Sequence, residues 1–221
     1  MADIIIRQFD ARQSYVNTWQ TMQTFTASRT QETIDELWLL EHFPVFTQGL
    51  AGKAEHILNP HDIPVVQTDR GGQVTYHGPG QLMLYCLLNL PRLHLHLRPF
   101  IRTLENTLVD YLQALSITAH GNPTAPGVYV SDTKMASIGL RIRRGFSYHG
   151  VALNIRLDLT PFSYINPCGF KGLQMTQISD YIPDITVSQV RQEIIPYFLN
   201  HFGYNHPTIV NESLPVTSVE V

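Results

Sequence analysis

The chain has 221 residues, of which 43% are hydrophobic and 15% charged, and no apolar run approaches the roughly 18 residues that a membrane helix needs. This composition predicts a globular protein without a membrane partner, and we expect residues 1–221 to form a single domain with one substantial core. The net charge of −3 argues against nucleic acid as a general partner, because that binding depends on an excess of basic residues.

The start of the chain and its cysteines indicate a compartment. Met1-Ala2-Asp3 is not followed by the basic segment and apolar stretch of a secretory signal, so we expect a cytoplasmic protein. The two cysteines, Cys86 and Cys168, form no Cys-x-x-Cys pair. A structural disulfide is therefore the less favoured interpretation.

The first half of the chain predicts strands around one helix. Apolar residues predict a short strand at 4–6 and a buried strand at 37–42. Between them, large residues from Tyr15 to Phe25 recur at intervals of four, three and three, which predicts an amphipathic helix. A loop over 60–66 leads into a glycine-rich run, and a central strand follows over 82–90.

The second half predicts two helices around a hairpin. Apolar residues at helical spacing predict a helix over 100–115, with Glu105 and Asp110 on its polar side. Strict alternation predicts a β-hairpin over 135–155, with its turn at Arg144-Gly145. A further helix over 188–202 contains Pro196, which predicts a kink or a break. The strands and helices do not follow a strict βαβ order, so the expected fold class is α+β, with a mixed sheet and flanking helices.

Residues 205–221 show no clear period and are expected to form a loosely attached tail.

The most informative segment is Arg70-Gly71-Gly72-Gln73-Val74-Thr75-Tyr76-His77-Gly78-Pro79-Gly80-Gln81. Glycine is favoured where the backbone takes unusual dihedral angles or approaches another group closely, and linkers rarely also carry Tyr, Arg and His. A tight turn between two strands is the alternative interpretation. The glycine spacing fits neither a phosphate-binding P-loop nor a dinucleotide fingerprint.

Cys168 and Lys134 are the candidates for covalent chemistry. Cys168 lies between a proline and a glycine, and a thiolate there can act as a nucleophile if a positive group stabilises it. Lys134, one of three lysines in the chain, could supply that charge, although an exposed lysine at a strand end is the simpler interpretation. His77 and His149 could serve the same thiolate.

Metal binding is not favoured by the sequence. His94-x-His96 offers two imidazoles, but no cysteine or acidic partner follows at a zinc-like spacing. Arg141, Arg143 and Arg144 lie at the predicted hairpin tip. A solvated turn and a docking surface for an acidic partner are both open interpretations of that cluster.

Three segments together resemble the lipoyl(octanoyl) transferase family. They are the run 70–81, the stretch from Gly127-Val128-Tyr129-Val130 through Lys134-Met135-Ala136-Ser137-Ile138-Gly139-Leu140-Arg141-Ile142, and Asn166-Pro167-Cys168-Gly169. The resemblance spans Arg70 to Ser179 and is looser on either side. It implies the fold of the biotin and lipoate protein ligase catalytic domains.

The resemblance also implies an activity and its partners. The family transfers an octanoyl group from octanoyl-acyl carrier protein to a lysine of the lipoyl domains of 2-oxoacid dehydrogenases and of the glycine cleavage H protein, and uses no cofactor. Cys168 would carry the acyl group as a thioester, and Lys134 would tune it. The implied acyl pocket comprises Arg70, Gly71, Gly72, Gln73, Val74, Thr75, Tyr76, His77, Ser137, Ile138, Gly139, Gly150, Val151 and Ala152.

Elementary chemistry is compatible with that activity. Cys168 would attack the donor thioester, and backbone amides near Gly169 or a polar side chain would hold the oxyanion. Glycines at 71, 72, 139 and 150 would leave room for an acyl tunnel. Three alternatives remain open: an ATP-dependent lipoate or biotin protein ligase, an acyl-carrier binding module without activity, and a thioesterase.

Overall fold

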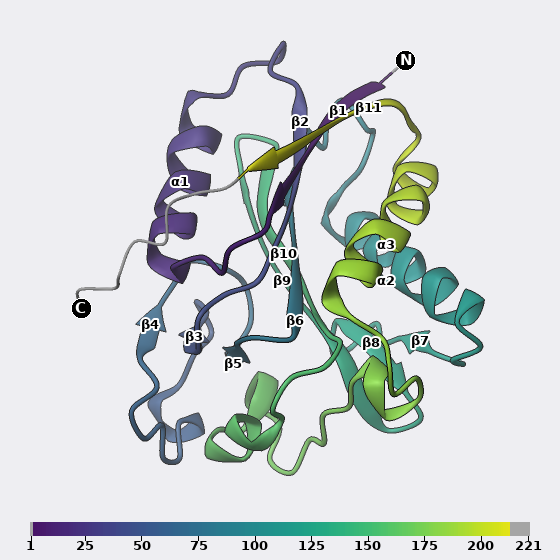
Figure 1. Cartoon of the computed structure of the whole chain (residues 1–221). Coiled ribbons are helices and arrows are strands. Elements are labelled where there is room, and N and C mark those ends of the chain that lie inside the picture. The colour runs from purple at the N-terminus through teal and green to yellow at the C-terminus, as the bar shows by residue number, and fades with distance from the viewer. Residues whose placement is uncertain (1, 213–221) are drawn as a thin grey trace.

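The computed structural model describes residues 2–212 and contains one large sheet and one small sheet (Figure 1). The strands of the large sheet are β1 (Ala2–Phe9), β2 (Asp35–Leu40), β6 (Gln81–Leu87), β7 (His120–Gly121), β8 (Gly127–Val130), β9 (Thr133–Arg143), β10 (Phe146–Asn154) and β11 (Tyr204–Glu212). Their order is β11-β1-β2-β6-β10-β9-β8-β7. Strand β1 pairs parallel with β11 and β2, and the other neighbours pair antiparallel. The α+β prediction with a mixed sheet is confirmed.

The predicted hairpin is present. Strands β9 and β10 pair from Arg143↔Phe146 to Ala136↔Leu153. Arg144 and Gly145 both have positive φ, at 53° and 86°, as a two-residue turn that matches strand twist requires. Strand β6 is buried along its whole length and pairs with β2 and β10, so the predicted central strand is also confirmed.

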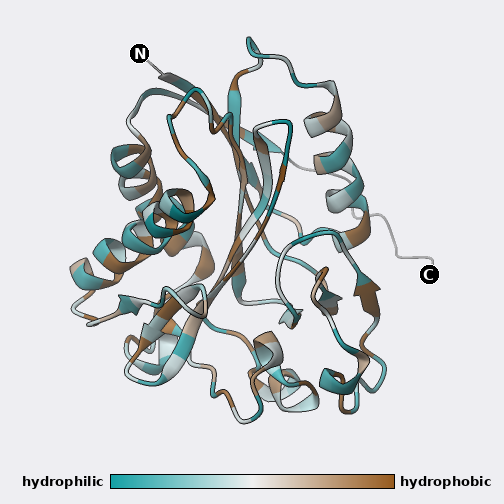
Figure 2. Ribbon diagram, turned by 180° about the vertical axis from the view of Figure 1, so that it is seen from behind, coloured by the Kyte–Doolittle hydropathy of each residue, from teal (hydrophilic) through white to brown (hydrophobic). Residues whose placement is uncertain are grey.

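Three α-helices cover the large sheet: α1 (Tyr15–Ser28), α2 (Leu97–Ala114) and α3 (Val187–Phe202). The Ser14 and Thr186 side chains each accept a backbone N–H at the start of α1 and α3, which satisfies donors that a helix start leaves unpaired. Helices α2 and α3 pack on one face and α1 on the other (Figure 1). From behind, hydrophobic residues concentrate on the strands between these two layers (Figure 2).

The structure corrects three expectations about these elements. Helix α3 continues through Pro196 to Phe202, so the break that was one of the two outcomes expected at Pro196 is absent. Glu105 is buried, not on a polar face, and its carboxylate accepts the Gly127 N–H at 3.0 Å. Residues 205–212 are not a loose tail, because strand β11 pairs with β1 along an outer edge of the sheet. The rest of the predicted tail, 213–221, lies outside the described residues.

The small sheet has the order β4-β3-β5 and consists of β3 (Val45–Gln48), β4 (Val65–Gln67) and β5 (Val74–His77). Strand β4 therefore begins inside the loop predicted over 60–66. Short 3₁₀ helices are η1 (Ala54–His56), η2 (Thr160–Tyr164), η3 (Pro167–Gly169) and η4 (Ile178–Asp180). The small sheet lies on the same side of the large sheet as α1 (Figure 1). Within residues 2–212, no helix is long and apolar enough to cross a membrane.

Candidate active site

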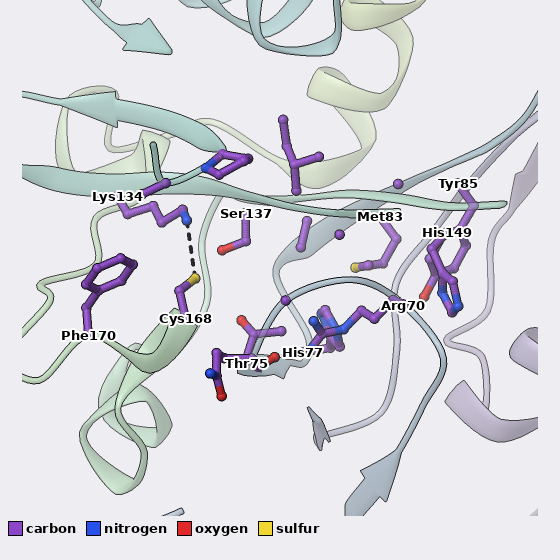
Figure 3. Close-up of a pocket in the computed structure, with 18 of the residues that line it drawn as sticks. Arg70, Thr75, His77, Met83, Tyr85, Lys134, Ser137, His149, Cys168 and Phe170 are labelled. Atoms are coloured by element: carbon purple, nitrogen blue, oxygen red, sulfur yellow. Dashed lines mark hydrogen bonds between the residues drawn. The ribbon is translucent and has the colours of Figure 1, made fainter. Parts of the chain in front are cut away.

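A cavity of about 260 Å³ lies where the two sheets meet, between β5 and the strands β6, β9 and β10. Figure 3 shows Cys168, Lys134 and Phe170 at one end and Met83, Tyr85 and His149 at the other. The first end opens to solvent, since Phe170 is 50% exposed, whereas Met83, Tyr85 and His149 are buried. The cavity is therefore a pocket with an open mouth at Cys168 and a closed inner end.

Lys134 and Cys168 meet at the mouth of this pocket. The Lys134 Nζ donates a hydrogen bond to the Cys168 Sγ at 3.2 Å. Lys134 is 1% exposed, and its ammonium lies 5.2 Å from the centre of the Tyr129 ring. A lysine nitrogen at this distance from a sulfur is within reach for proton transfer between the two side chains.

Backbone hydrogen bonds hold the two residues together across 34 positions of sequence. The Lys134 N–H donates to the Gln174 carbonyl at 2.9 Å, and the Thr176 N–H donates to the Lys134 carbonyl at 3.0 Å. These bonds form a parallel bridge between Lys134 and Met175. The segment after Cys168 thus pairs with the sheet beside Lys134. This pairing keeps the Cys168 thiol close to the Lys134 side chain.

Cys168 has an unusual backbone conformation. Its φ and ψ of 56° and 15° place it in the left-handed region, which costs a non-glycine residue roughly 1–2 kcal/mol. Such strain often marks a functional position, because the surrounding structure must impose it. Here the Asn166 N–H donates to the His56 carbonyl at 2.8 Å and fixes the loop from its other side.

The backbone amides after Cys168 are already engaged. The Gly169 N–H donates to the Asn166 carbonyl at 2.9 Å, and the Phe170 N–H donates to the Pro167 carbonyl at 3.0 Å. The Gly169 and Phe170 amides are therefore not free to hold an oxyanion, and the other part of the expectation, a polar side chain, stays a prediction. The Thr75 side chain lies on the opposite wall, near Cys168 (Figure 3), and it is a polar side chain that could serve instead.

Arg70 shapes the glycine-rich run from within. Its buried guanidinium donates to the backbone carbonyls of Thr47, Gly71 and Gln73 and to the Thr47 hydroxyl. Burial lowers the pKa of Arg70 from its ordinary value. Because all of these acceptors are neutral oxygens, Arg70 adds a positive charge to the pocket wall while it holds the run in place.

His77 lines the same wall as a neutral imidazole. Its Nε2 lies 3.0 Å from the Thr47 hydroxyl and its Nδ1 lies 2.8 Å from the Gln81 Oε1. Burial, with the nearby His42 and Arg70, holds the pKa of His77 well below its ordinary value. Since the Gln81 Oε1 only accepts, the Nδ1 carries the hydrogen.

Most residues predicted for the acyl pocket line this cavity. They are Arg70, Gly72, Gln73, Thr75, His77, Ser137, Ile138, Gly139, Gly150 and Ala152, and the predicted supporting residue His149 joins them.

Four predicted pocket residues do not line the cavity. Val74 and Tyr76 pack into the core of the small sheet, and Val151 packs into the core under α2 and α3. Successive side chains of a strand point to opposite faces, so Thr75 and His77 face the pocket while their neighbours face away. Gly71 instead donates its N–H to the Leu140 carbonyl at 2.9 Å.

Gly150 has a different role from the one predicted. A Cβ at this position would lie 1.9 Å from the Leu84 carbonyl oxygen on β6. The glycine is therefore required by the close approach of two strand backbones and not by space for an acyl chain.

His149, the residue before Gly150, is buried and pairs with the half-buried Asp69 at the closed end. The His149 Nε2 lies 2.8 Å from the Asp69 Oδ1, and Asp69 also accepts from Trp19, Gln23 and Tyr148. Burial would raise the pKa of Asp69, but these hydrogen bonds outweigh it and hold the pKa well below the ordinary value. Burial lowers the pKa of His149, and Asp69 only partly offsets this.

Sequence reasoning missed seven lining residues: Tyr15, Met83, Tyr85, Thr124, Ala125, Pro126 and Phe170. Met83 and Tyr85 alternate along the predicted central strand, so a signal for them was present once that strand is placed beside Gly150. The residues of segment 124–126 carry no comparable signal.

Other predicted candidates lie away from the pocket. His94 and His96 are exposed before α2, and Arg141, Arg143 and Arg144 are exposed at the end of the hairpin. Cys86 is buried in β6, and burial raises the pKa of its thiol. Among the residues that the structure describes, no cluster of three or more His, Cys, Asp or Glu side chains could hold a metal ion.

Comparison with known proteins gives a consistent assignment. Residues 14–199 match the family model described as the lipoyl protein ligase A/B catalytic domain. The chain is 62% identical to an octanoyltransferase of Coxiella burnetii over 96% of this chain and 88% of that protein. It is 56% identical to an octanoyltransferase of Hahella chejuensis over 91% of this chain and 89% of that protein.

Solved structures share the fold. A lipoate-protein ligase A bound with ATP superposes with a TM-score of 0.74 at 15% identity and covers 98% of this chain and 90% of that chain. A putative lipoate protein ligase of T. acidophilum with bound lipoic acid gives a TM-score of 0.72 at 15% identity, over 98% and 91%. A biotin protein ligase of Aquifex aeolicus gives 0.55 at 13% identity, over 91% and 70%.

Proposed function

This chain belongs to the lipoyl protein ligase A/B catalytic domain family and, within it, to the octanoyltransferases, and we propose that it moves the octanoyl group through a thioester on Cys168. As an acyltransferase of protein lipoylation it needs a donor and an acceptor. The proposed donor is octanoyl-acyl carrier protein. The proposed acceptors are the lysines of the lipoyl domains of 2-oxoacid dehydrogenases and of the glycine cleavage H protein.

The observation that carries this proposal is the 3.2 Å contact between Lys134 and Cys168 at the mouth of the pocket. A ligase that activates a free acid with ATP has no need of a nucleophilic thiol. A buried lysine that contacts a thiol on a strained loop instead provides the parts of a nucleophile and its proton carrier.

In the first transfer, the Cys168 thiolate attacks the carbonyl carbon of the donor thioester. A new carbon–sulfur bond forms, and the Thr75 hydroxyl, on the facing wall, is the proposed donor to the resulting oxyanion. When the intermediate collapses, the bond to the carrier sulfur breaks, and the Lys134 ammonium gives its proton to the departing thiolate. The acyl group then lies on Cys168, and Lys134 is neutral.

In the second transfer, neutral Lys134 takes a proton from the ammonium of the acceptor lysine. The acceptor amine attacks the Cys168 thioester, the amide bond forms, and Cys168 leaves as a thiolate. The amide nitrogen releases its extra proton to solvent. The overall reaction converts a thioester and an ammonium into an amide, a carrier thiol and one proton, and it restores the starting ion pair.

Mass spectrometry tests the intermediate and the donor together. Purified protein incubated with octanoyl-acyl carrier protein is expected to gain one octanoyl group on Cys168, and an added lipoyl domain should then receive it. Cys86→Ala is the matched control, because it removes the other cysteine and leaves the acyl group in place. A Cys168→Ala variant that still modifies the lipoyl domain would refute the covalent route. Modification from free octanoate and ATP, without acylated carrier, would identify a ligase.

A further inference from the structure

Lys134 faces the pocket because strand β9 carries a bulge beside it. The register of β8 against β9 shifts after Ala136, and Met135 is the extra residue on β9. Met135 and Ala136 therefore both lie in the core under α2 and α3. Without the extra residue, the alternation that starts from Ser137, which lines the pocket, would turn Lys134 into that core. The bulge instead directs Lys134 to Cys168.

Gly127, the first residue of β8, lies directly against this bulge. A Cβ at Gly127 would lie 2.4 Å from the Ala136 carbonyl oxygen and 2.5 Å from the Lys134 Cε. The Gly127 backbone is thus one wall around the lysine side chain, and the Tyr129 ring, 5.2 Å from the Nζ, is another. The place of Gly127 therefore helps to set the direction of the Lys134 side chain.

Glu105 on α2 holds Gly127 from the other side. Helix α2 packs against β7 and β8 (Figure 1), and Glu105 is 5% exposed. Its Oε1 accepts the Gly127 N–H at 3.0 Å, and a Cβ at Gly121 would lie 2.7 Å from its Oε2. The carboxylate therefore contacts both ends of segment 121–127. The middle of that segment lines the pocket with Thr124, Ala125 and Pro126.

The residue type at position 105 is informative. Other buried positions of α2 are mostly apolar, among them Phe100, Leu104, Leu108 and Leu112. A leucine would fill such a position without a polar group to satisfy, whereas a buried carboxylate is costly unless it is hydrogen-bonded. What Glu105 adds at this cost is an acceptor for the Gly127 N–H.

We propose that Glu105 is a positioning residue, whose hydrogen bond to the Gly127 N–H holds the β9 bulge in place and keeps the Lys134 Nζ in contact with the Cys168 Sγ. Glu105 does not line the pocket, so it acts through Gly127 and Lys134. This inference rests on the proposed function, because a fixed Lys134 matters where Lys134 passes protons to and from the reacting groups.

Iodoacetamide labelling of Cys168, followed by mass spectrometry, tests this role in the full chain. A Cys86→Ala background leaves one cysteine. Glu105→Leu has a side chain of similar size but no acceptor. A displacement of about 1 Å at a reacting group can cost about a hundredfold in rate, so we expect labelling to slow by about tenfold, because Lys134 no longer takes up the thiol proton. Glu105→Gln keeps an acceptor oxygen and should label within about twofold of the unmodified rate.

A double-mutant cycle separates positioning from a general loosening of the fold. In a Lys134→Ala background, Glu105→Leu should change the labelling rate by less than about twofold, because the side chain through which Glu105 acts is gone. Thr107→Val is the matched control in both backgrounds. It removes a buried hydroxyl of α2 whose hydrogen bond goes to the Thr103 carbonyl within the helix, so the labelling rate should not change.

Gly121→Ala reaches the same contact from another element and does not alter α2. Its new Cβ would lie 2.7 Å from the Glu105 Oε2 and displace the carboxylate. Labelling should slow when Lys134 is present and stay unchanged in the Lys134→Ala background. This variant decides the question even where Glu105→Leu does not fold.

The outcomes separate the two proposals. Unchanged labelling in Glu105→Leu and Gly121→Ala overturns the role of Glu105, and so does an equal slowing in the Lys134→Ala background. A Glu105→Gln protein as slow as Glu105→Leu overturns it too. Transfer of octanoyl from the carrier to a lipoyl domain should follow the same order of rates. A protein that transfers no octanoyl refutes the proposed function, and the labelling cycle still decides whether Glu105 positions Lys134.

Discussion

Acid should destabilise the fold through His42, a fully buried residue behind the pocket. Burial lowers the pKa of His42 from its ordinary 6.5 to about 4. The unfolded chain therefore binds a proton that the folded chain rejects, and the stability from neutral His42 is present above pH 6.5 and lost as the pH falls toward 4. Between pH 7.5 and pH 5.0 this linkage removes about 2 kcal/mol.

Urea unfolding at these two pH values measures the effect. His42→Gln removes the titrating group, so its free energy of unfolding should fall by about 2 kcal/mol less between pH 7.5 and 5.0 than that of the unmodified protein. The control is Leu108→Ala, on the far side of the sheet. It should cost about 2–5 kcal/mol at both pH values and leave the pH dependence unchanged. A His42→Gln protein with the full acid loss would refute the reasoning.

Three further predictions concern backbone contacts and a buried charge. Gly150→Ala should lower the free energy of unfolding in urea by about 3 kcal/mol or more, because the new Cβ meets the β6 backbone. The control is Gly172→Ala, at a φ of 78° in open space, which should lower it by about 1 kcal/mol. Equal losses in the two variants would contradict this reasoning. Gly127→Ala should slow iodoacetamide labelling of the mouth thiol by about tenfold, because the new Cβ would lie 2.5 Å from the Lys134 Cε; an unchanged rate in folded protein would count against it. Asp35→Asn should cost about 3–5 kcal/mol, measured by thermal unfolding, because it leaves a buried arginine without its charge partner; a loss below about 1 kcal/mol would show that the pair is not needed.

Period-two alternation could have assigned the pocket walls more accurately from the sequence. Val74 and Tyr76 belong to a glycine-rich run, and the run as a whole predicts a site. Once 74–77 forms a strand, however, only every second side chain can face that site. Thr75 and His77 are the pair that does, since the other two lie in the small-sheet core. The run lies beside a cavity, and two of its four strand residues face that cavity.

The contact between Lys134 and Cys168 was beyond local sequence reasoning. Each residue has a simple structural interpretation, and their proximity depends on a two-residue match between Lys134 and the backbone of Gln174 and Thr176. These are main-chain hydrogen bonds, which any non-proline residue can form. The burial of Glu105 could not be predicted from the sequence for the same reason. A helical pattern places a glutamate on the polar face, whereas Glu105 is buried because it accepts a hydrogen bond from the distant Gly127 amide.

The two ends of the pocket are specified in different ways, and this explains which of them the sequence revealed. At the mouth, backbone bonds around Lys134 and a strained Cys168 fix the positions of two reactive atoms. Glycine and proline mark such geometry in a sequence. At the inner end, the Asp69 carboxylate joins the side chains of Trp19, Tyr148 and His149. These side chains come from α1, from the residue before the glycine-rich run and from β10, so their contact becomes visible only when the three segments are placed together.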